Sequence, residues 1–218
     1  MAHQRSRSWA GSSTIEQRSD EVDERAADDL NVEDVVSEFF YSSLRRRGYS
    51  TEALTTAGLS RRGALAVDSP ERQLALRLQQ IGDSVTLDDA TTLPLIEHFD
   101  DVHDDGYETF REVARRMIRG PGPITWGRVA ALFLFGVRLA ETWMERRPRR
   151  GVLARAPALL HVVAWLSQFV VEELIAWITA ADGGGWRGIV DNVTRNYWKA
   201  AIGGACIFAS VVLFYLRR

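Results

Sequence analysis

Two long segments in the second half of the chain carry almost no charge, and they constrain the fold more than any other feature. Residues 129–137 contain no charged side chain, and residues 158–178 contain only Glu172 and Glu173. A helix that is apolar on nearly every face lies either at the centre of a bundle or inside a membrane. Two resident membrane spans and a buried hairpin both satisfy this rule. We favour a buried hairpin, because the rest of the chain supplies amphipathic helices that could surround it.

Those surrounding helices are predicted from apolar residues at steps of three and four. A first helix begins near Val32 and is expected to stop at Gly48. A second begins with Pro70 in its first turn. Further helices are expected at about 93–103 and 106–118, whereas residues 50–69 are expected to form a linker. Alternation of period two is absent, so the predicted fold class is all-α: a helical bundle around a central hydrophobic helical hairpin.

The two ends of the chain differ in character. Residues 1–30 hold seven acidic residues against four arginines and no apolar run, which predicts a disordered tail. Residues 200–216 carry no charge and would span roughly 26 Å as a helix, near the short limit for crossing a bilayer. The predicted organisation is therefore a tail at 1–30, a helical bundle at 31–196 and a C-terminal membrane anchor at 197–218. The alternative for the last segment is a buried core helix.

Composition and charge limit the classes of function that the chain can have. The net charge of -2 and the isoelectric point near 6.1 argue against nucleic-acid binding, and one cysteine, Cys206, fits a reducing compartment. His98 and His103 lie among aspartates and could bind a metal, but residues 88–108 hold eight acidic residues and no Lys or Arg, so a solvated acidic face is favoured. His161 is expected to be a core histidine. We predict no enzyme, no cofactor and no metal site.

Three short motifs follow one another along the chain. The first presents apolar residues about one helical turn apart, with a glycine and an aspartate: Leu74, Leu78, Ile81, Gly82, Asp83 and Val85. The next lies about 40 residues on: Trp126, Gly127, Arg128, Val129, Phe135 and Gly136. The last comprises Trp177, Gly184, Gly185 and Trp186. In this order they resemble the third (BH3), first and second homology motifs of the Bcl-2 family of apoptosis regulators.

The spacing of the first motif also has a physical interpretation. Four apolar side chains on one helix face are typical of a helix that docks in a groove. Gly82 suits a point where another helix backbone approaches closely. Asp83 can pair with an arginine, and Arg128 is the candidate at the groove edge. The same apolar residues could equally be core residues, and we expect both roles, in a closed and in an active state.

Within the family, the run from Thr125 to Leu132 and the segment Tyr107-Glu108-x-Phe110 are most like the Bak-type pro-apoptotic effectors. This resemblance implies a protein tail-anchored in the mitochondrial outer membrane and facing the cytosol, with the endoplasmic reticulum or a partly cytosolic pool as alternatives. It implies that a BH3 helix triggers the protein, which then oligomerises through BH3-in-groove dimers and opens the membrane. Implied partners are BH3-containing proteins, other family members, a second copy of the chain and membrane lipid.

Two other functions stay open. The stretch from Phe39 to Ser50 resembles the fourth motif of the family's survival-promoting guardians, which would sequester BH3 helices in the groove without forming a pore. A colicin-like toxin, in which the hydrophobic hairpin inserts directly, is a more distant alternative.

Overall fold

The computed structural model describes residues 31–59, 69–85, 87, 89–100, 106–120, 122–146 and 155–179. The chain divides into two units, Met1–Leu30 and Asn31–Arg218, and all described helices belong to the second. In chain order they are α2 (Val32–Arg46), α3 (Thr51–Thr56), α4 (Pro70–Gly82), α5 (Asp89–Asp100), α6 (Gly106–Ile118), α7 (Trp126–Arg146), α8 (Arg155–Phe169), the π-helical turn η3 (Val170–Leu174) and α9 (Ile175–Thr179). The described residues contain no strand, so the all-α prediction is confirmed.

Capping residues explain where the first helices begin and end. The side chain of Asn31 accepts a hydrogen bond from the backbone N–H of Glu33 at the start of α2, at 3.0 Å. Gly48 follows the helix with a φ of 97°, a left-handed conformation that favours glycine and stops the helix as predicted. Ser69 caps α4, and Pro70 occupies its first turn, where a missing N–H costs no helical hydrogen bond.

Two expected boundaries were wrong. A short helix, α3, occupies part of the expected linker, because Ser50 caps it by accepting a hydrogen bond from Ala53 and Leu54 is fully buried beneath it. Six residues are too few to show a helical period in the sequence. Helix α5 begins at Asp89, before the expected position 93, and includes Pro94, since burial of its apolar residues maintains the helix around the proline: Leu95, Ile96 and Phe99.

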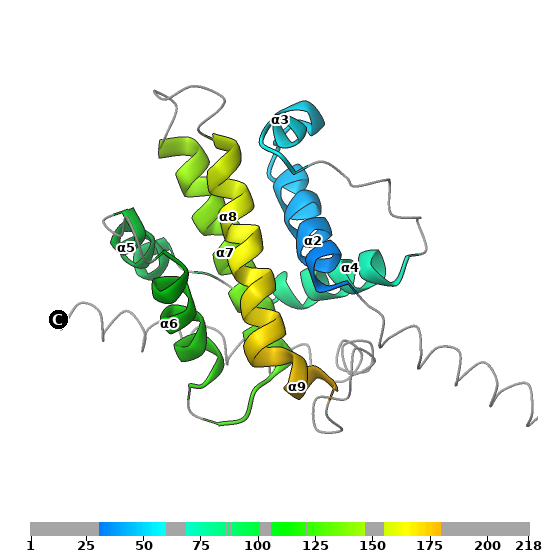
Figure 1. Ribbon diagram of the computed structural model, residues 1–218, viewed down its shortest axis with the longest axis vertical. Helices are drawn as coiled ribbons and strands as arrows, with labels where there is room; N and C mark the ends of the chain where they lie inside the picture. The colour runs from blue at the N-terminus through cyan, green and yellow to red at the C-terminus, as the bar shows by residue number, and fades with distance from the viewer. Residues whose placement is uncertain are drawn as a thin grey trace, which may run out of the picture. The chain divides into compact units, whose positions relative to one another are not determined.

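Helices α7 and α8 form the predicted hairpin at the centre of the bundle. In Figure 1 they stand between α2 with α4 on one side and α5 with α6 on the other. Buried aromatic rings join the layers: Phe39 of α2 packs edge-on against Phe133 of α7, with centroids 5.1 Å apart, and Phe110 of α6 packs against Phe135. Along α7, Phe133 and Phe135 are almost wholly buried. Their burial places the core around this helix.

The second helix of the hairpin is less enclosed than the first. Among the described residues, the stretch Leu159–Ile178 is the one long and apolar enough to cross a membrane: an 18-residue window within it has a mean hydropathy of 1.5, and 39% of that window is buried. Leu160 and Val171 are 41% and 51% exposed. Length and composition of this kind are shared by core helices and membrane spans. The packing of α8 against α7 and α2 places it in the bundle here.

Candidate functional site: helix α4 and the start of helix α7

The apolar stripe predicted on α4 faces the interior of the bundle. Leu74, Leu78 and Ile81 are 7%, 0% and 6% exposed, and Val85, just beyond the helix, is 7% exposed. The stripe packs against α2 and α7. Leu76, on the opposite face of the same helix, is 42% exposed. The helix is therefore amphipathic, and its apolar face is occupied within its own chain.

Gly82 lies where α4 ends against α7. A Cβ atom built at this position would come within 3.1 Å of Cδ1 of Leu134, which is tighter than most real contacts. The absence of a side chain at Gly82 leaves room for the side chain of Leu134 on α7, so the close neighbour here is a side chain and not the helix backbone expected from the sequence. Gly136 allows a second close approach, because a Cβ there would lie 3.0 Å from Cζ of the buried Phe40.

Asp83 follows Gly82 and pairs with Arg46 at the end of α2. Its two carboxylate oxygens accept hydrogen bonds from Nη2 and Nη1 of Arg46, at 2.8 and 3.1 Å. The hydrogen bond and the neighbouring charge of Asp83 raise the pKa of Arg46. Both side chains are about half exposed, 52% for Arg46 and 54% for Asp83. The bidentate geometry fixes orientation at a site that stays open to solvent.

Arg128, the expected partner of Asp83, has a different position. It is 9% exposed, and its Nη1 donates hydrogen bonds to the backbone carbonyls of Ile118 and Gly120, both at 3.0 Å, and of Gly122 at 3.3 Å. These carbonyls belong to the end of α6 and to the connection leading to α7. In the closed chain, Arg128 therefore holds the α6–α7 connection, while Asp83 is held by α2.

The start of α7 unites two of the sequence motifs. Thr125 precedes the helix, and its carbonyl and hydroxyl oxygens accept hydrogen bonds from the N–H of Arg128, at 3.0 and 3.3 Å. Trp126, the first residue of α7, is 3% exposed, and its ring lies 5.0 Å from that of Trp177 in α9. Trp126 is thus a structural residue at a helix start, in contact with the later motif. Gly184, Gly185 and Trp186 lie outside the described residues.

The other residues of the motif at the start of α7 are core residues. Gly127 is buried, Val129 is 2% exposed and Phe135 is fully buried. The ring of Phe135 lies 6.1 Å from Phe99 and 6.4 Å from Phe110. This motif therefore joins α5, α6 and α7 rather than presenting side chains to solvent.

Polar contacts between α2 and α4 form a seam that sequence reasoning missed. Gln79, 4% exposed, donates from Nε2 to the hydroxyl of Ser43 at 3.1 Å and to the carbonyl of Phe39 at 3.3 Å. The buried carboxylate of Glu38 lies 3.7 Å from Nε of Arg72. Together with the Asp83–Arg46 pair, these contacts follow both helices in the same order. Gln79 also donates to the hydroxyl of Ser42, and the spacing of four between Glu38, Ser42 and Arg46 on α2 was the sequence signal that could have revealed the seam.

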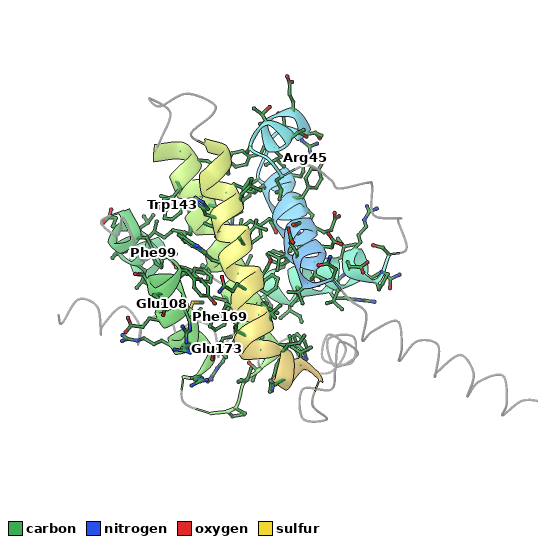
Figure 2. All side chains as sticks on the ribbon, viewed as in Figure 1. Arg45, Phe99, Glu108, Trp143, Phe169 and Glu173 are labelled. Atoms are coloured by element: carbon green, nitrogen blue, oxygen red, sulfur yellow. The ribbon has the colours of Figure 1, made fainter. Side chains whose placement is uncertain are left out.

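A second ionic cluster joins α6 to the π-helical turn η3. Glu173, whose side chain is 13% exposed, pairs with Arg115, with Arg119 at 3.0 Å and with Arg111 at 3.6 Å. Two arginines of α6 and Arg119, which directly follows the helix, thus converge on the carboxylate of Glu173, which is labelled in Figure 2. The sequence analysis treated Glu173 only as an interruption of an apolar run. The spacing of four residues between these arginines was the sequence signal that could have revealed the cluster.

A neighbouring contact perturbs a tyrosine on the same face of α6. The hydroxyl of Tyr107 donates a hydrogen bond to Glu172 at 2.5 Å. Burial of the phenol, followed in size by this hydrogen bond and the charge of Glu172, raises the pKa of Tyr107. Both carboxylates of η3 therefore engage α6.

The histidines do not form a metal centre in the described part of the chain. His161 was expected in the core, but it is exposed on α8 and stacks on Trp165 with ring centroids 6.1 Å apart, so that prediction was wrong. Among the described residues, no group of three His, Cys, Asp or Glu side chains could hold a metal ion. Residues 101–105, which include His103, lie outside the described residues, as does the side chain of His98.

Comparison with known proteins identifies a family whose members are similar to this chain. Residues 78–186, half of the chain, match the family described as apoptosis regulator proteins, Bcl-2 family. The mouse (Mus musculus) protein named apoptosis regulator BAX is 29% identical over 134 residues, which make up 61% of this chain and 62% of that protein. The human (Homo sapiens) protein of the same name is 30% identical over 133 residues, which make up 61% of this chain and 62% of that protein.

A further match is shorter. Bcl-2-like protein 1 of Gallus gallus is 28% identical over 90 residues, 41% of this chain and 34% of that protein. The aligned part of the chain thus spans less than two thirds of the length of these relatives.

Proposed function

The chain belongs to the Bcl-2 family of apoptosis regulator proteins, and we propose that it acts there as a pro-apoptotic effector that permeabilises the mitochondrial outer membrane. The observation that carries this proposal is the burial of the α4 stripe: Leu74, Leu78, Ile81 and Val85 are at most 7% exposed. A BH3-like helix whose anchors are already buried in its own chain must leave the bundle before it can dock elsewhere. The closed chain then corresponds to a resting state.

A BH3 helix from another protein is the proposed trigger. It shifts the population toward the open state only if it binds that state more tightly than the closed one. The exposed end of the α2–α4 seam favours opening there, because solvent-exposed ion pairs such as Asp83–Arg46 contribute only about 0–1 kcal/mol. The apolar anchors around Leu78 supply most of the resistance, since their burial is complete or nearly so.

Opened chains then associate in pairs, with α4 of each in the groove of the other. In this proposal Asp83 of one chain meets Arg128 of its partner in an isologous contact. Because Arg128 now donates to the carbonyls of Ile118, Gly120 and Gly122, the contact requires the α6–α7 connection to rearrange. Activation therefore involves two changes: Asp83 exchanges Arg46 for Arg128, and Arg128 exchanges backbone carbonyls for a carboxylate.

The membrane is the proposed site of action. Residues 197–218, which lie outside the described residues, would anchor the chain by their apolar run. The amphipathic helices released from the bundle would then spread on the bilayer. The length and hydropathy of Leu159–Ile178 support a further membrane contact for the hairpin once its covering helices leave. The proposed partners are BH3-containing proteins, other members of the family and lipid.

A guardian is the competing function, favoured by the stretch of α2 that resembles the fourth motif. In the structure Phe39, Phe40 and Leu44 of this stretch are fully buried against the hairpin. A guardian would bind BH3 helices in its groove while the bundle stays closed. The two functions therefore differ in whether α4 leaves the core.

Dye release from liposomes separates them. The full-length protein is added to cardiolipin-containing vesicles together with a synthetic peptide of residues 69–87, and the control is the same peptide carrying Leu78→Glu. We expect release with the first peptide and none with the second or with protein alone. Peptide binding without release, together with suppression of release by a separate effector, would support the guardian and overturn the effector.

A further inference from the structure

A pocket of about 500 Å³ lies between α3 and the C-terminal end of α7, away from the α4 stripe. Its apolar surface comes from Leu54, Ala57 and Met144, and Tyr49 adds an aromatic side chain. Glu52 and Glu145 also line it. This volume falls in the range of pockets that bind small molecules, about 300–1,000 Å³. The volume of the pocket and the residues that line it are typical of a ligand-binding site, and the proposed function does not use this pocket.

The charge of the pocket selects the kind of ligand. Among the described lining residues, the two charged side chains are both carboxylates, Glu52 and Glu145, and both are exposed. Three arginines among the described residues, one in α2, one directly after it and one in α7, donate hydrogen bonds to groups other than Glu52 and Glu145. Arg47 donates to Glu141 at 2.5 Å, as does Arg138 at 2.9 Å, and Arg45 donates to the backbone carbonyl of Tyr49 at 2.7 Å.

Tyr49 completes the site as a neutral aromatic group. Its hydroxyl donates a hydrogen bond to Oε1 of Glu145 at 3.3 Å. Burial, then the charges of Glu141 and Glu145, raise the pKa of this tyrosine to about 12, so the phenol keeps its proton at neutral pH. An aromatic ring beside carboxylates attracts an ammonium group through both the ring quadrupole and the negative charge.

We propose that this pocket binds a small organic cation, an apolar body that carries one protonated amine. The apolar part packs on Leu54, Ala57 and Met144, and the ammonium group lies between Glu52 and Glu145. Such a ligand bridges α3 to α7. Because it binds the folded chain and not the unfolded one, it raises the stability of the folded bundle, and the increase grows with the logarithm of ligand concentration above the dissociation constant.

Three probes of equal shape and different charge test the proposal on the full-length protein in detergent micelles. They are 4-phenylbutylamine, 4-phenylbutanol and 4-phenylbutyrate, each titrated to millimolar concentration while the melting temperature and the dissociation constant are measured. We expect the amine to bind and to raise the melting temperature, the alcohol to bind more weakly, and the carboxylate to have no effect. Equal shifts with all three probes would overturn the proposal.

Two variants locate the binding. The double variant Glu52→Gln and Glu145→Gln keeps the shape of the pocket and is expected to weaken amine binding by about tenfold, because it removes two partly exposed charge contacts. Ala53→Phe, on the exposed face of α3, is expected to fill the pocket and abolish binding. Glu112→Gln on α6, which removes a carboxylate outside the pocket, is the control and should bind like the wild type. Unchanged amine binding in Ala53→Phe would place the ligand elsewhere and refute the site. These readouts report on the resting chain and do not depend on membrane permeabilisation.

Discussion

Asp83 and Arg46 form a two-point ion pair that joins the end of the BH3-like helix to the end of α2, with both side chains about half exposed. Arg128, the motif residue expected to pair with Asp83, is instead buried against three backbone carbonyls. The closed chain and the proposed dimer therefore use different partners for the same aspartate. Substitutions at Asp83 and Arg46 can test the dimer and the resting state separately.

The first prediction concerns this exchange. Asp83→Arg places two like charges together at Arg46 and removes the proposed contact with Arg128 of a second chain. We expect the free energy of unfolding to fall by only about 1 kcal/mol, because the pair is solvent-exposed, while peptide-triggered oligomerisation on liposomes is lost.

Arg46→Ala is the matched control for that variant. It breaks the same pair in the resting chain but leaves Asp83 intact for a partner. We expect a similar small loss of stability, retained oligomerisation and a lower peptide concentration for half-maximal dye release. Normal oligomerisation by Asp83→Arg, measured by cross-linking, would show that the proposed Asp83–Arg128 contact between chains is wrong.

The second prediction concerns the anchors of α4. Leu78 is fully buried, so Leu78→Ala should lower the free energy of unfolding by about 2–5 kcal/mol through lost burial and a residual cavity. Leu78→Glu should in addition abolish killing in cells, because a carboxylate is costly to desolvate in a groove. Leu76→Ala, on the 42% exposed face of the same helix, should leave both nearly unchanged. A Leu78→Glu protein that keeps its activity and its melting temperature would disprove the placement of the stripe.

The third prediction concerns alkaline pH. The pKa of Tyr49 is raised to about 12, and that of Tyr107 is also raised, from an unfolded value of about 10. The unfolded chain therefore releases these protons first, so the stabilisation is fully present below about pH 10 and is lost as pH rises toward the folded values. Lys199 is the single lysine in the sequence, so tyrosines dominate titration in this window.

Urea unfolding between pH 9 and pH 11.5 measures this effect. Tyr49→Phe should flatten the fall of the unfolding free energy with pH, because it removes one of the perturbed groups. Tyr107→Phe should flatten the fall as well, because the pKa of this tyrosine is also raised in the folded chain. If the slope of Tyr49→Phe matches that of the wild type, the buried environment inferred for this phenol is incorrect.

Much of the fold could be predicted because its determinants are local. The apolar period of α2, the proline at the start of α4 and the charge-free run in α7 each specify an element without reference to distant residues. Helix α3 escaped prediction because its capping serine and single buried residue, Leu54, carry no period. His161 was misplaced because an apolar run does not reveal which face of a nearly uniform helix meets the bundle.

The candidate site was predictable in its residues but not in its pairings. Leu78 lies in the core, one of the two roles expected for it, and Gly82 lies at the end of α4 against the side chain of Leu134. The partner of Asp83 depends on where α2 ends, and the role of Arg128 depends on the path of the α6–α7 connection. Tertiary packing sets both, and short motifs do not encode it.

The last prediction concerns residues 200–216, which lie outside the described residues. Their uncharged run is short for a plasma-membrane span, and Arg217 with Arg218 supplies a basic flank. Fused to a fluorescent protein, residues 197–218 should direct it to mitochondria, and the chain lacking them should be recovered mainly in the soluble fraction. Replacing both terminal arginines by serine tests whether the basic flank contributes to mitochondrial targeting. Reticular staining of the intact fusion would redirect the anchor to the endoplasmic reticulum, whereas diffuse staining would show that the segment is not an anchor and would favour a helix packed in the core.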